Sequence, residues 1–266
     1  MLYFVATPIG NLKDISYRAI ETLKSVDAIA CEDTRRSLTL LSAYDIKKPL
    51  FSYHKFNEKE AGEKIIERLK NGENIAVISD AGMPVISDPG GTLINLLKEN
   101  NLEYTVVPGA SACLSALVLS GLSGERFCFL GFLPEKKTER ENLLSEYSEI
   151  DATLIFYCAP HDVEKDVSTL YAALGDRKAV AVREITKIHE SAETFNLKDG
   201  YTGNVKGEFV ILVEGADKTA FFSDLSEEEH INKYLEQGMD KKEAIKKVAK
   251  ERGVSKSSLY KYTINK

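Results

Sequence analysis

Short apolar runs alternate with amphipathic stretches along the first part of the chain. The run at 75–78, IAVI, is flanked by polar residues and is typical of a strand that is buried on both faces of a sheet. Residues 58–71 instead space their apolar positions three to four apart, which predicts an amphipathic helix, and Gly72 suits its left-handed C-terminal cap. Strands that alternate with helices predict a mostly parallel sheet covered on both sides.

The same pattern gives the order of elements and two boundaries. The first part has predicted strands at 2–6, 28–31, 50–53, 75–78 and 104–107. Its predicted helices are 16–24, a short helix with Leu38 and Leu41 on one face, 58–71, 92–99 and 112–120. After a polar link at 121–126, we predict strands 127–131, 152–157, 179–183 and 209–213, the last closing a second sheet, and helices 138–147 and 162–173. We therefore expect an α/β protein with domains at 1–121 and 122–217 and a tail at 218–266.

The tail differs from the rest of the chain in pattern and in charge. A helix at 241–250, a turn at Gly253 and a Ser255-capped helix at 256–262 are similar to a helix-turn-helix unit. Residues 240–266 hold nine Lys and Arg against three Asp and Glu, a charge of +6 in a chain of −6 overall. The remainder therefore carries −12. This basic tail predicts a polyanionic partner such as a nucleic acid, while the alternative is a helical hairpin that docks on the body or mediates dimerisation.

Composition indicates a soluble globular protein without a membrane partner. Of the 266 residues, 43% are hydrophobic and 29% are charged, and no apolar stretch reaches the length of about 20 residues that spans a bilayer. The N-terminal apolar run has no basic region before it, so we predict a strand in place of a signal peptide and a cytoplasmic location. Four separated cysteines without a CxxC pair predict buried free thiols and no metal or disulfide framework: Cys31, Cys113, Cys128 and Cys158.

The loop at 79–91, SDAGMPVISDPGG, carries the first chemical signal. It places Asp80 and Asp88 after a buried strand, at the sheet edge where open α/β sheets bind ligands. Phosphate-binding loops pair their glycines with Lys, Ser or Thr, whereas two carboxylates would repel a polyphosphate. Carboxylates suit ribose hydroxyls, a cationic group or a metal ion, so S-adenosylmethionine is an attractive candidate. The alternative is that these aspartates only cap helices.

Eight motifs in order then suggest a family. They are TPIGNL at 7–12, EDTR at 32–35, SDAGMPVISDPG at 79–90, PGASA at 108–112, GFLP at 131–134, APH at 159–161, REITKIHE at 183–190 and KGEFVILVEG at 206–215. Together they cover essentially the whole chain, and the series resembles the 16S rRNA (cytidine-2′-O)-methyltransferase family of the tetrapyrrole methylase superfamily.

This resemblance implies two α/β domains of tetrapyrrole-methylase type, with S-adenosyl-L-methionine in a cleft between them and a helical tail. It also implies a homodimer that methylates a ribose 2′-hydroxyl of a decoding-site cytidine in 16S rRNA, as free rRNA or in the small ribosomal subunit. The cofactor-binding residues that it implies are Pro8, Gly10, Asp80, Gly82, Met83, Ser111, Ala112 and Tyr157.

The chain departs from the family pattern at two places. Met83 stands where the family usually has Thr, so a side-chain hydroxyl contact is absent there while a backbone contact survives. The turn at 157–162 reads YCAPHD where the family usually has YEAPHR. Because an acid is lost and a base becomes an acid, we leave Cys158 and Asp162 out of the predicted site.

Methyl transfer to a hydroxyl gains from orientation and from a base that removes the proton. Six charged loop residues are candidates near the cleft: Asp33, His54, Glu184, Lys187, His189 and Glu190. We predict that Asp33 with Arg35, and Lys187 with Glu190, carry the catalysis, and the sequence does not identify the base. The alternative for each is an ion pair at the surface or between domains.

Three other functions remain open at this point. The same fold could methylate a small tetrapyrrole, although the basic tail argues against that substrate. A metal-dependent hydrolase could use Glu32, Asp33, Asp80 and Asp88, although no histidine pattern accompanies them and we expect no metal. A non-catalytic RNA-binding module would leave the two acidic, glycine-rich loops without a purpose.

Overall fold

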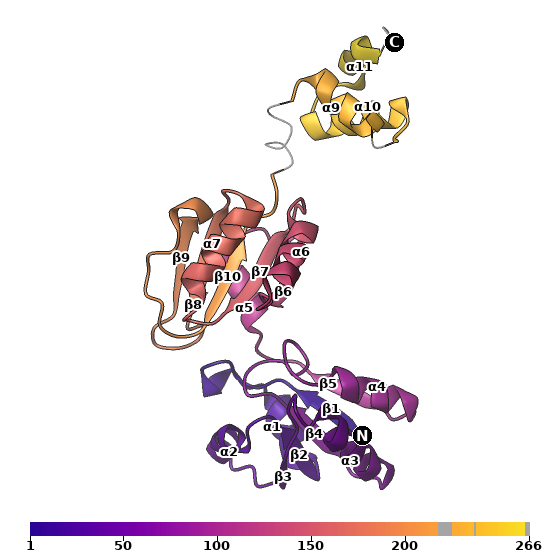
Figure 1. The fold of residues 1–266 in the computed structure, drawn as a ribbon. Helices are drawn as coiled ribbons and strands as arrows, with labels where there is room; N and C mark the ends of the chain where they lie inside the picture. The colour runs from indigo at the N-terminus through magenta and orange to yellow at the C-terminus, as the bar shows by residue number, and fades with distance from the viewer. Residues whose placement is uncertain (218–224, 237, 264–266) are drawn as a thin grey trace.

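The computed structural model describes residues 1–217, 225–236 and 238–263. Figure 1 shows two α/β units in succession, followed by a small helical unit. The domain limits at 121 and 217 remain a prediction, and the limit at 217–218 adjoins residues outside the described part. None of the described helices is both long enough and apolar enough to cross a bilayer.

The first sheet is parallel and has the order β3-β2-β4-β1-β5. Its strands are β1 (Leu2–Val5), β2 (Ala28–Cys31), β3 (Leu50–Ser52), β4 (Ile75–Ile78) and β5 (Tyr104–Val107). Its helices are η1 (Leu12–Asp14), α1 (Tyr17–Ser25), α2 (Thr34–Ala43), α3 (Glu58–Lys70) and α4 (Gly91–Glu99). The predicted strands and their parallel arrangement are confirmed.

Alternate residues of the central strands face two separate cores. Leu2 and Val77 pack with α3 and α4 on one face, while Val5 and Ile78 pack with α1 and α2 on the other. Leu38 and Leu41 both lie in α2, three positions apart and so on one side of the helix, but their burial differs: Leu41 is buried and Leu38 is 53% exposed.

The second sheet is mixed and has the order β6-β7-β10-β8-β9. Its strands are β6 (Phe127–Phe132), β7 (Thr153–Cys158), β8 (Lys178–Arg183), β9 (Ser191–Asn196) and β10 (Phe209–Val213). The prediction that β10 closes this sheet is wrong. All five of its residues are buried, so it lies at the centre and pairs antiparallel with both β7 and β8. The edge strand β9 was not predicted.

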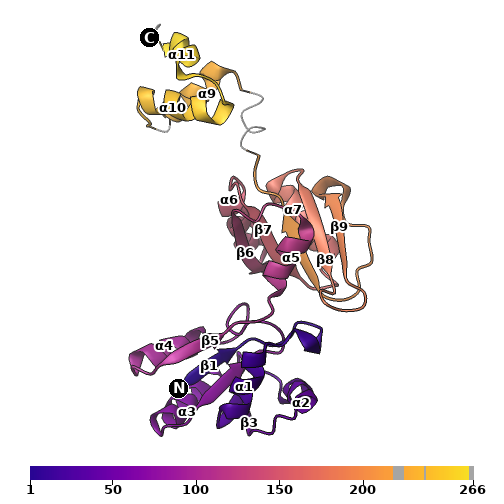
Figure 2. The ribbon, with the colours of Figure 1, turned by 180° about the vertical axis from the view of Figure 1, so that it is seen from behind.

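Helices cover both faces of this second sheet. Helices α6 (Lys137–Tyr147) and α7 (Val163–Leu174) cover one face, and the short η2 (Leu197–Asp199) follows β9. Helix α5 (Ala112–Ser120) covers the other face, as Figure 2 shows. Its Cys113, Ala116 and Leu117 pack against that face. The sequence analysis places α5 in the first domain, whereas its packing assigns it to the second sheet.

The helical unit has a core of its own. It consists of α9 (Glu227–Glu236), α10 (Lys241–Arg252), α11 (Lys256–Leu259) and η3 (Tyr260–Thr263). The predicted turn and cap are confirmed: Gly253 has a φ of 63°, and the Ser255 side chain accepts a hydrogen bond from the Ser258 amide. The predicted second helix is instead one α turn followed by a 3-10 turn, and α9 was not predicted.

All four cysteines are free thiols. Cys31, Cys113 and Cys158 are buried as predicted, and Cys128 is only partly buried. The Cys158 thiol donates a hydrogen bond to the buried carboxylate of Asp166 (Sγ to Oδ2, 3.3 Å).

Candidate active site

A cavity of about 480 Å³ lies at the carboxyl ends of β4 and β2 and is completed by the second α/β unit. This volume is in the range of about 300 to 1,000 Å³ that is typical of small-molecule sites. The first unit contributes the loop after β4, and the second contributes the ends of β6 and β7 and the start of β10. The predicted location of the site, at strand ends and between two domains, therefore coincides with a cavity.

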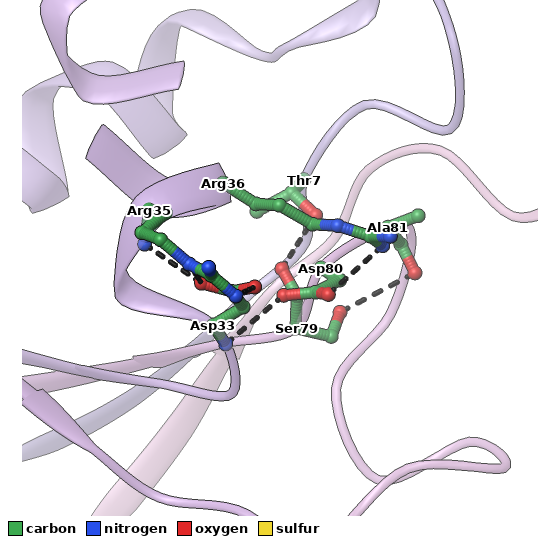
Figure 3. A network of polar contacts seen from close by, with 7 residues as sticks. All are labelled: Thr7, Asp33, Arg35, Arg36, Ser79, Asp80 and Ala81. Carbon is green, nitrogen blue, oxygen red and sulfur yellow. Dashed lines mark hydrogen bonds and ion pairs between the residues drawn. The ribbon is translucent and has the colours of Figure 1, made fainter. Parts of the chain in front are cut away.

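Asp80 ties together the loops after β2 and β4, as Figure 3 shows. Its Oδ1 accepts a hydrogen bond from the Asp33 amide at 3.2 Å, and its Oδ2 pairs with Nη1 of Arg36 at 3.1 Å. The loop after β1 is held by Thr7, which exchanges two backbone hydrogen bonds with Gly82 (2.9 and 3.1 Å). The Asp80 carboxylate thereby joins two loops, and backbone hydrogen bonds join the third loop to the one after β4.

The alternative that the loop aspartates serve as helix caps does not describe Asp80. The first amides of α4 are satisfied by Glu58 of α3, whose Oε1 accepts from Gly90 N at 2.9 Å and from Thr92 N at 3.2 Å. Asp33 does cap a helix, because its Oδ1 accepts from the Arg35 amide at the start of α2 (2.8 Å).

The charge of the cavity lining is predominantly negative. Four carboxylates line it, together with one guanidinium: Glu32, Asp80, Asp88, Glu208 and Arg36. Burial, followed by repulsion from Glu32 and Asp80, raises the pKa of Asp88 to about 6. Burial and the charge of Asp80 also raise the pKa of Glu32. A cationic ligand would relieve this repulsion, whereas a polyphosphate would increase it.

The opposite wall is apolar and aromatic. Tyr157 packs edge-to-face against Phe129 and Phe132, with ring centroids 4.8 and 5.6 Å apart. Met83 and Ile86 add apolar surface from the loop after β4. Such a wall accepts the flat face of a base. The same loop has backbone strain, since the β-branched Val85 has a φ of 77°, and strain of this kind is concentrated at functional sites.

Most of the predicted cofactor-binding residues meet in this cavity. Six of them line it: Asp80, Gly82, Met83, Ser111, Ala112 and Tyr157. Pro8 and Gly10 do not line it, although Ile9 between them does. Gly10 lies against the loop after β8, where a Cβ on it would come within 2.7 Å of Lys187 Cγ. Glycine is therefore needed there for close packing between the two units.

The predicted catalytic residues form two groups beside the cavity. In the first unit, the Arg35 guanidinium pairs with Asp33 at 3.1 Å, next to Asp80. In the second unit, Lys187 Nζ lies 2.8 Å from Glu184 and 2.9 Å from the cavity-lining Glu208. None of these predicted residues lines the cavity itself.

Glu190 supports the loop of Lys187 through a hydrogen bond to the backbone. Its Oε2 accepts a hydrogen bond from the Thr186 amide at 2.6 Å and closes the turn that carries Lys187. Burial lowers the pKa of Lys187, but hydrogen bonds to Glu184 and Glu208 outweigh it and raise that pKa above the ordinary value. Lys187 is therefore a cation at neutral pH. The catalytic assignments remain predictions.

Several cavity residues were missed by the sequence analysis. Glu32 is the first residue of the EDTR motif and was considered only as a metal ligand, and Arg36 directly follows that motif. Phe132 and Glu208 lie within the motifs GFLP and KGEFVILVEG but were not chosen. Cys158 was set aside and nevertheless lines the cavity. Among the described residues, no group of three or more His, Cys, Asp and Glu is arranged to hold a metal ion.

The raised pKa of Asp88 predicts an unusual dependence of stability on pH. Its ordinary value is 3.8 and its value in the folded chain is about 6, so the folded state binds the proton more tightly. The free energy of unfolding should therefore fall as pH rises from about 4 to above 6, by about 1 to 2 kcal/mol after allowance for partial exposure. Urea unfolding of the wild type and of Asp88→Asn at pH 4.5 and 7.5 checks this.

In that comparison Asp88→Asn should gain stability over the wild type at pH 7.5 and gain little at pH 4.5. An equal difference between the two proteins at both pH values would contradict the assignment.

The fold matches solved structures. It matches a crystal structure of diphthine synthase with a TM-score of 0.66 and 19% identity, over 80% of this chain and 89% of that one. It also matches the methyltransferase CobJ with a TM-score of 0.63 and 18% identity, over 81% and 94%. At these identities the likeness shows the fold alone. The family model for tetrapyrrole (corrin/porphyrin) methylases matches residues 1–199, and the chain belongs to this family.

Within that family, several relatives that match nearly the whole chain share one name. The chain is 42% identical to "Ribosomal RNA small subunit methyltransferase I" of Bacillus subtilis (strain 168), over 98% of this chain and 92% of the relative. It is 42% identical to the protein of that name from Haemophilus influenzae, over 98% and 95%. It is 38% identical to that of Synechocystis sp., over 99% and 97%. The resemblance inferred from the eight motifs is confirmed.

Proposed function

We propose that this chain transfers a methyl group from S-adenosyl-L-methionine to the ribose 2′-hydroxyl of a decoding-site cytidine in 16S rRNA. The observation that carries the proposal is the cavity between the two units, which combines acidic residues on one side with aromatic residues on the other. The names of relatives that match nearly the whole chain support small-subunit rRNA as the substrate.

The cavity fits this cofactor chemically. A nucleoside with a sulfonium group needs an apolar slot for its base, acceptors for its ribose hydroxyls and negative charge near its cation. Phe132 and Tyr157 provide the slot, and Glu32, Asp80 and Asp88 provide carboxylate oxygens. The Asp80 carboxylate already has two partners, so its orientation is fixed before a ligand binds. The residues present therefore fit the group that the family uses.

The roles of the chain's own residues follow from their positions. When bound, the cofactor supplies an electrophilic methyl group. Orientation of the two reacting centres within a closed cavity can contribute roughly 7 to 11 kcal/mol. Lys187, as a cation beside Glu208, would stabilise negative charge that develops on the ribose oxygen, and Glu190 would hold its loop. We propose that the ion pair of Asp33 and Arg35, in the first unit, contributes to catalysis from the side of the cavity opposite Lys187.

One assay tests the reaction and the substrate together. Protein is incubated with labelled S-adenosylmethionine and either small ribosomal subunits, free 16S rRNA or a porphyrin precursor. We expect label in the rRNA, and mass spectrometry of the digested RNA should place the new methyl group on a cytidine ribose. Label in the porphyrin precursor alone would overturn the substrate, and methyl groups on bases alone would overturn the 2′-hydroxyl.

Calorimetry tests the cofactor independently of the substrate. We expect saturable heat with S-adenosylmethionine or S-adenosylhomocysteine and none with a nucleoside triphosphate, because the cavity lining repels phosphate. The opposite pattern would overturn the proposal.

We also propose that the chain forms a homodimer. Helix α5 is apolar on its outer side as well, where Leu114 and Val118 are 52% and 82% exposed. Val106 on the edge strand β5 is 44% exposed. An exposed apolar surface of this kind is typical of an interface. Sedimentation equilibrium should give twice the chain mass, and Val118→Lys should shift the protein to the monomer.

Deletion of residues 226–266 is expected to weaken RNA binding. In α10 the side chains of Lys242, Lys246 and Lys250 are exposed, so they can reach phosphates. The RNA association constant K falls with salt concentration. Each phosphate contact that is lost should make the slope of log K against log salt concentration less steep by about 0.7 to 0.9. Filter binding to 16S rRNA across a salt series measures both quantities.

A matched variant, Lys246→Gln with Lys250→Gln, keeps the helical unit and should lose part of the salt slope. Unchanged affinity and slope in the deletion would make the tail structural.

A further inference from the structure

The loop after β3 presents an aromatic ring to solvent beside the cavity. Phe56 is 94% exposed, and Ile188 in the loop after β8 is 97% exposed. Within the described part of the chain, these are the two large apolar side chains with more than 90% exposure. Single exposed apolar residues are common, but these two lie in loops that adjoin the same cavity. Lys187, next to Ile188, contacts the cavity-lining Glu208.

The position of Phe56 follows from the strand register. Strands β2 and β3 are parallel, and Cys31 pairs with Ser52, so the chain leaves both strands at the same edge of the sheet. The next residue after Cys31 is Glu32, which lines the cavity, and the next after Ser52 is Tyr53. Glu32, Tyr53 and Asp88 also line one small pocket together. This small pocket shares Glu32 and Asp88 with the cavity, and Phe56 is three residues beyond Tyr53.

The backbone that carries the ring is stiff. The His54 amide donates to Asn57 Oδ1 at 2.8 Å, the Asn57 amide donates to the His54 carbonyl at 3.0 Å, and Asn57 Nδ2 donates to the Ser52 carbonyl at 3.1 Å. The Phe56 ring also packs edge-to-face on His54, with centroids 6.1 Å apart. A backbone held in this way loses little freedom when a partner binds.

The loops that follow the neighbouring strands β2 and β3 carry exposed cations, and these favour a nucleic acid over an apolar protein surface. Arg35 and Arg36 start α2 beside the cavity, with side chains 88% and 72% exposed, and Lys55 precedes the ring and is exposed. An exposed aromatic ring flanked by cations is the combination with which proteins bind single-stranded nucleic acid, since the ring stacks on a base while the cations contact phosphates.

We propose that Phe56 stacks on the base next to the target nucleotide. This inference rests on the proposed function, because a ribose can reach the cavity only when its nucleotide leaves the stack. The neighbouring base then loses a stacking partner, and the Phe56 ring replaces it. Phe56 is thus a positioning residue for the RNA, and it contacts neither the cofactor nor the reacting atoms.

The experiment uses the full chain and a short single-stranded RNA with the decoding-site sequence. The RNA carries 2-aminopurine on the 5′ or the 3′ side of the target cytidine, because the fluorescence of this base is quenched by stacking. With wild-type protein we expect quenching at one of the two positions. Phe56→Ala should lose the quenching and bind the RNA about 5- to 150-fold more weakly, and Phe56→Tyr should retain both properties.

A matched control removes an exposed ring elsewhere. Tyr171→Ala, on α7, takes away a side chain that is 43% exposed and should leave quenching and affinity at wild-type values. With small ribosomal subunits, Phe56→Ala should raise KM, while kcat and the affinity for S-adenosylmethionine stay within a few fold of wild type. Circular dichroism verifies that each variant folds.

The outcomes separate this inference from the proposed function. Wild-type quenching and affinity in Phe56→Ala would overturn the stacking role while methyl transfer by the wild type stands. A loss seen with subunits and absent with the RNA oligonucleotide would assign the ring to a ribosomal protein and also overturn it. If the wild type transfers no methyl group to rRNA, the proposed function fails, and the 2-aminopurine signal still decides whether Phe56 stacks on RNA.

Discussion

Replacement of Lys187 by alanine is expected to slow single-turnover methyl transfer by about 10²- to 10³-fold, the usual cost of removing one group that stabilises a developing oxyanion. The ammonium lies between Glu184 and the cavity-lining Glu208, at 2.8 and 2.9 Å, and these hydrogen bonds keep it charged. A charged amine cannot take the proton from the ribose hydroxyl. It can stabilise the negative charge that appears on the oxygen.

Two further variants separate this role from packing. Lys187→Met keeps the aliphatic stem that lies against Gly10 and removes the charge, so it should be as slow as Lys187→Ala. Lys198→Ala removes a lysine that is also paired with a carboxylate, Asp176 at 3.2 Å, but lies in η2 and outside the cavity lining. Its rate should equal that of the wild type.

Quenched-flow measurement with saturating cofactor gives the single-turnover rate directly. The affinity for S-adenosylmethionine should change by no more than a few fold in all three variants. If Lys187→Met transfers methyl groups at the wild-type rate, the ion pair with Glu208 is structural and the catalytic assignment is wrong.

The central strands of the first sheet could be predicted from sequence because burial on both faces leaves a direct signal. All four residues of β4 are buried and apolar, and its bounds were predicted correctly. Strand β9 left no such signal. It is an edge strand whose residues alternate between partly buried and exposed, and its partly buried side chains are Ser191, Glu193 and Phe195. A pattern with two polar residues in three inward positions does not resemble a strand.

Helix α5 shows why the assignment of elements to domains was less accurate. Its sequence, ACLSALVLS, is apolar around the whole helix, so the pattern gives no preferred face. Proximity along the chain placed it with the first sheet, while its small residues pack on the second. Only the three-dimensional arrangement distinguishes the two.

The candidate site was predictable where its residues are neighbours in sequence and not where strand pairing brings them together. The composition of the loop at 79–91 and its position after a buried strand predicted a ligand site, and several of its residues line the cavity. The pairing of Lys187 with Glu208, 21 positions apart, depends on the register of β8 and β10, in which Arg183 lies opposite Phe209. Because this register is a property of the folded sheet, the sequence indicated Lys187 but not its partner.

Replacement of Asp80 by asparagine is expected to weaken S-adenosylmethionine binding by roughly 5- to 150-fold, or about 1 to 3 kcal/mol, the effect of one unit charge about 6 to 16 Å from a cation at an effective dielectric constant near 20. The isosteric amide retains an oxygen that can accept the Asp33 amide, so the loops stay in place. The carboxylate charge is lost, and the Arg36 guanidinium no longer has its counterion in the cavity lining. The cavity therefore becomes less attractive to a cation.

The partner arginine provides the matched control. Arg36→Met should bind S-adenosylmethionine at least as tightly as the wild type, and the double variant Asp80→Asn with Arg36→Met should recover part of the affinity lost in Asp80→Asn alone. Affinity for the uncharged sulfur of S-adenosylhomocysteine should fall less than that for the sulfonium in Asp80→Asn. Calorimetry at low ionic strength, where charge effects are screened least, measures all of these affinities. Equal losses for the two ligands would mean that Asp80 acts through its hydrogen bonds and not through its charge.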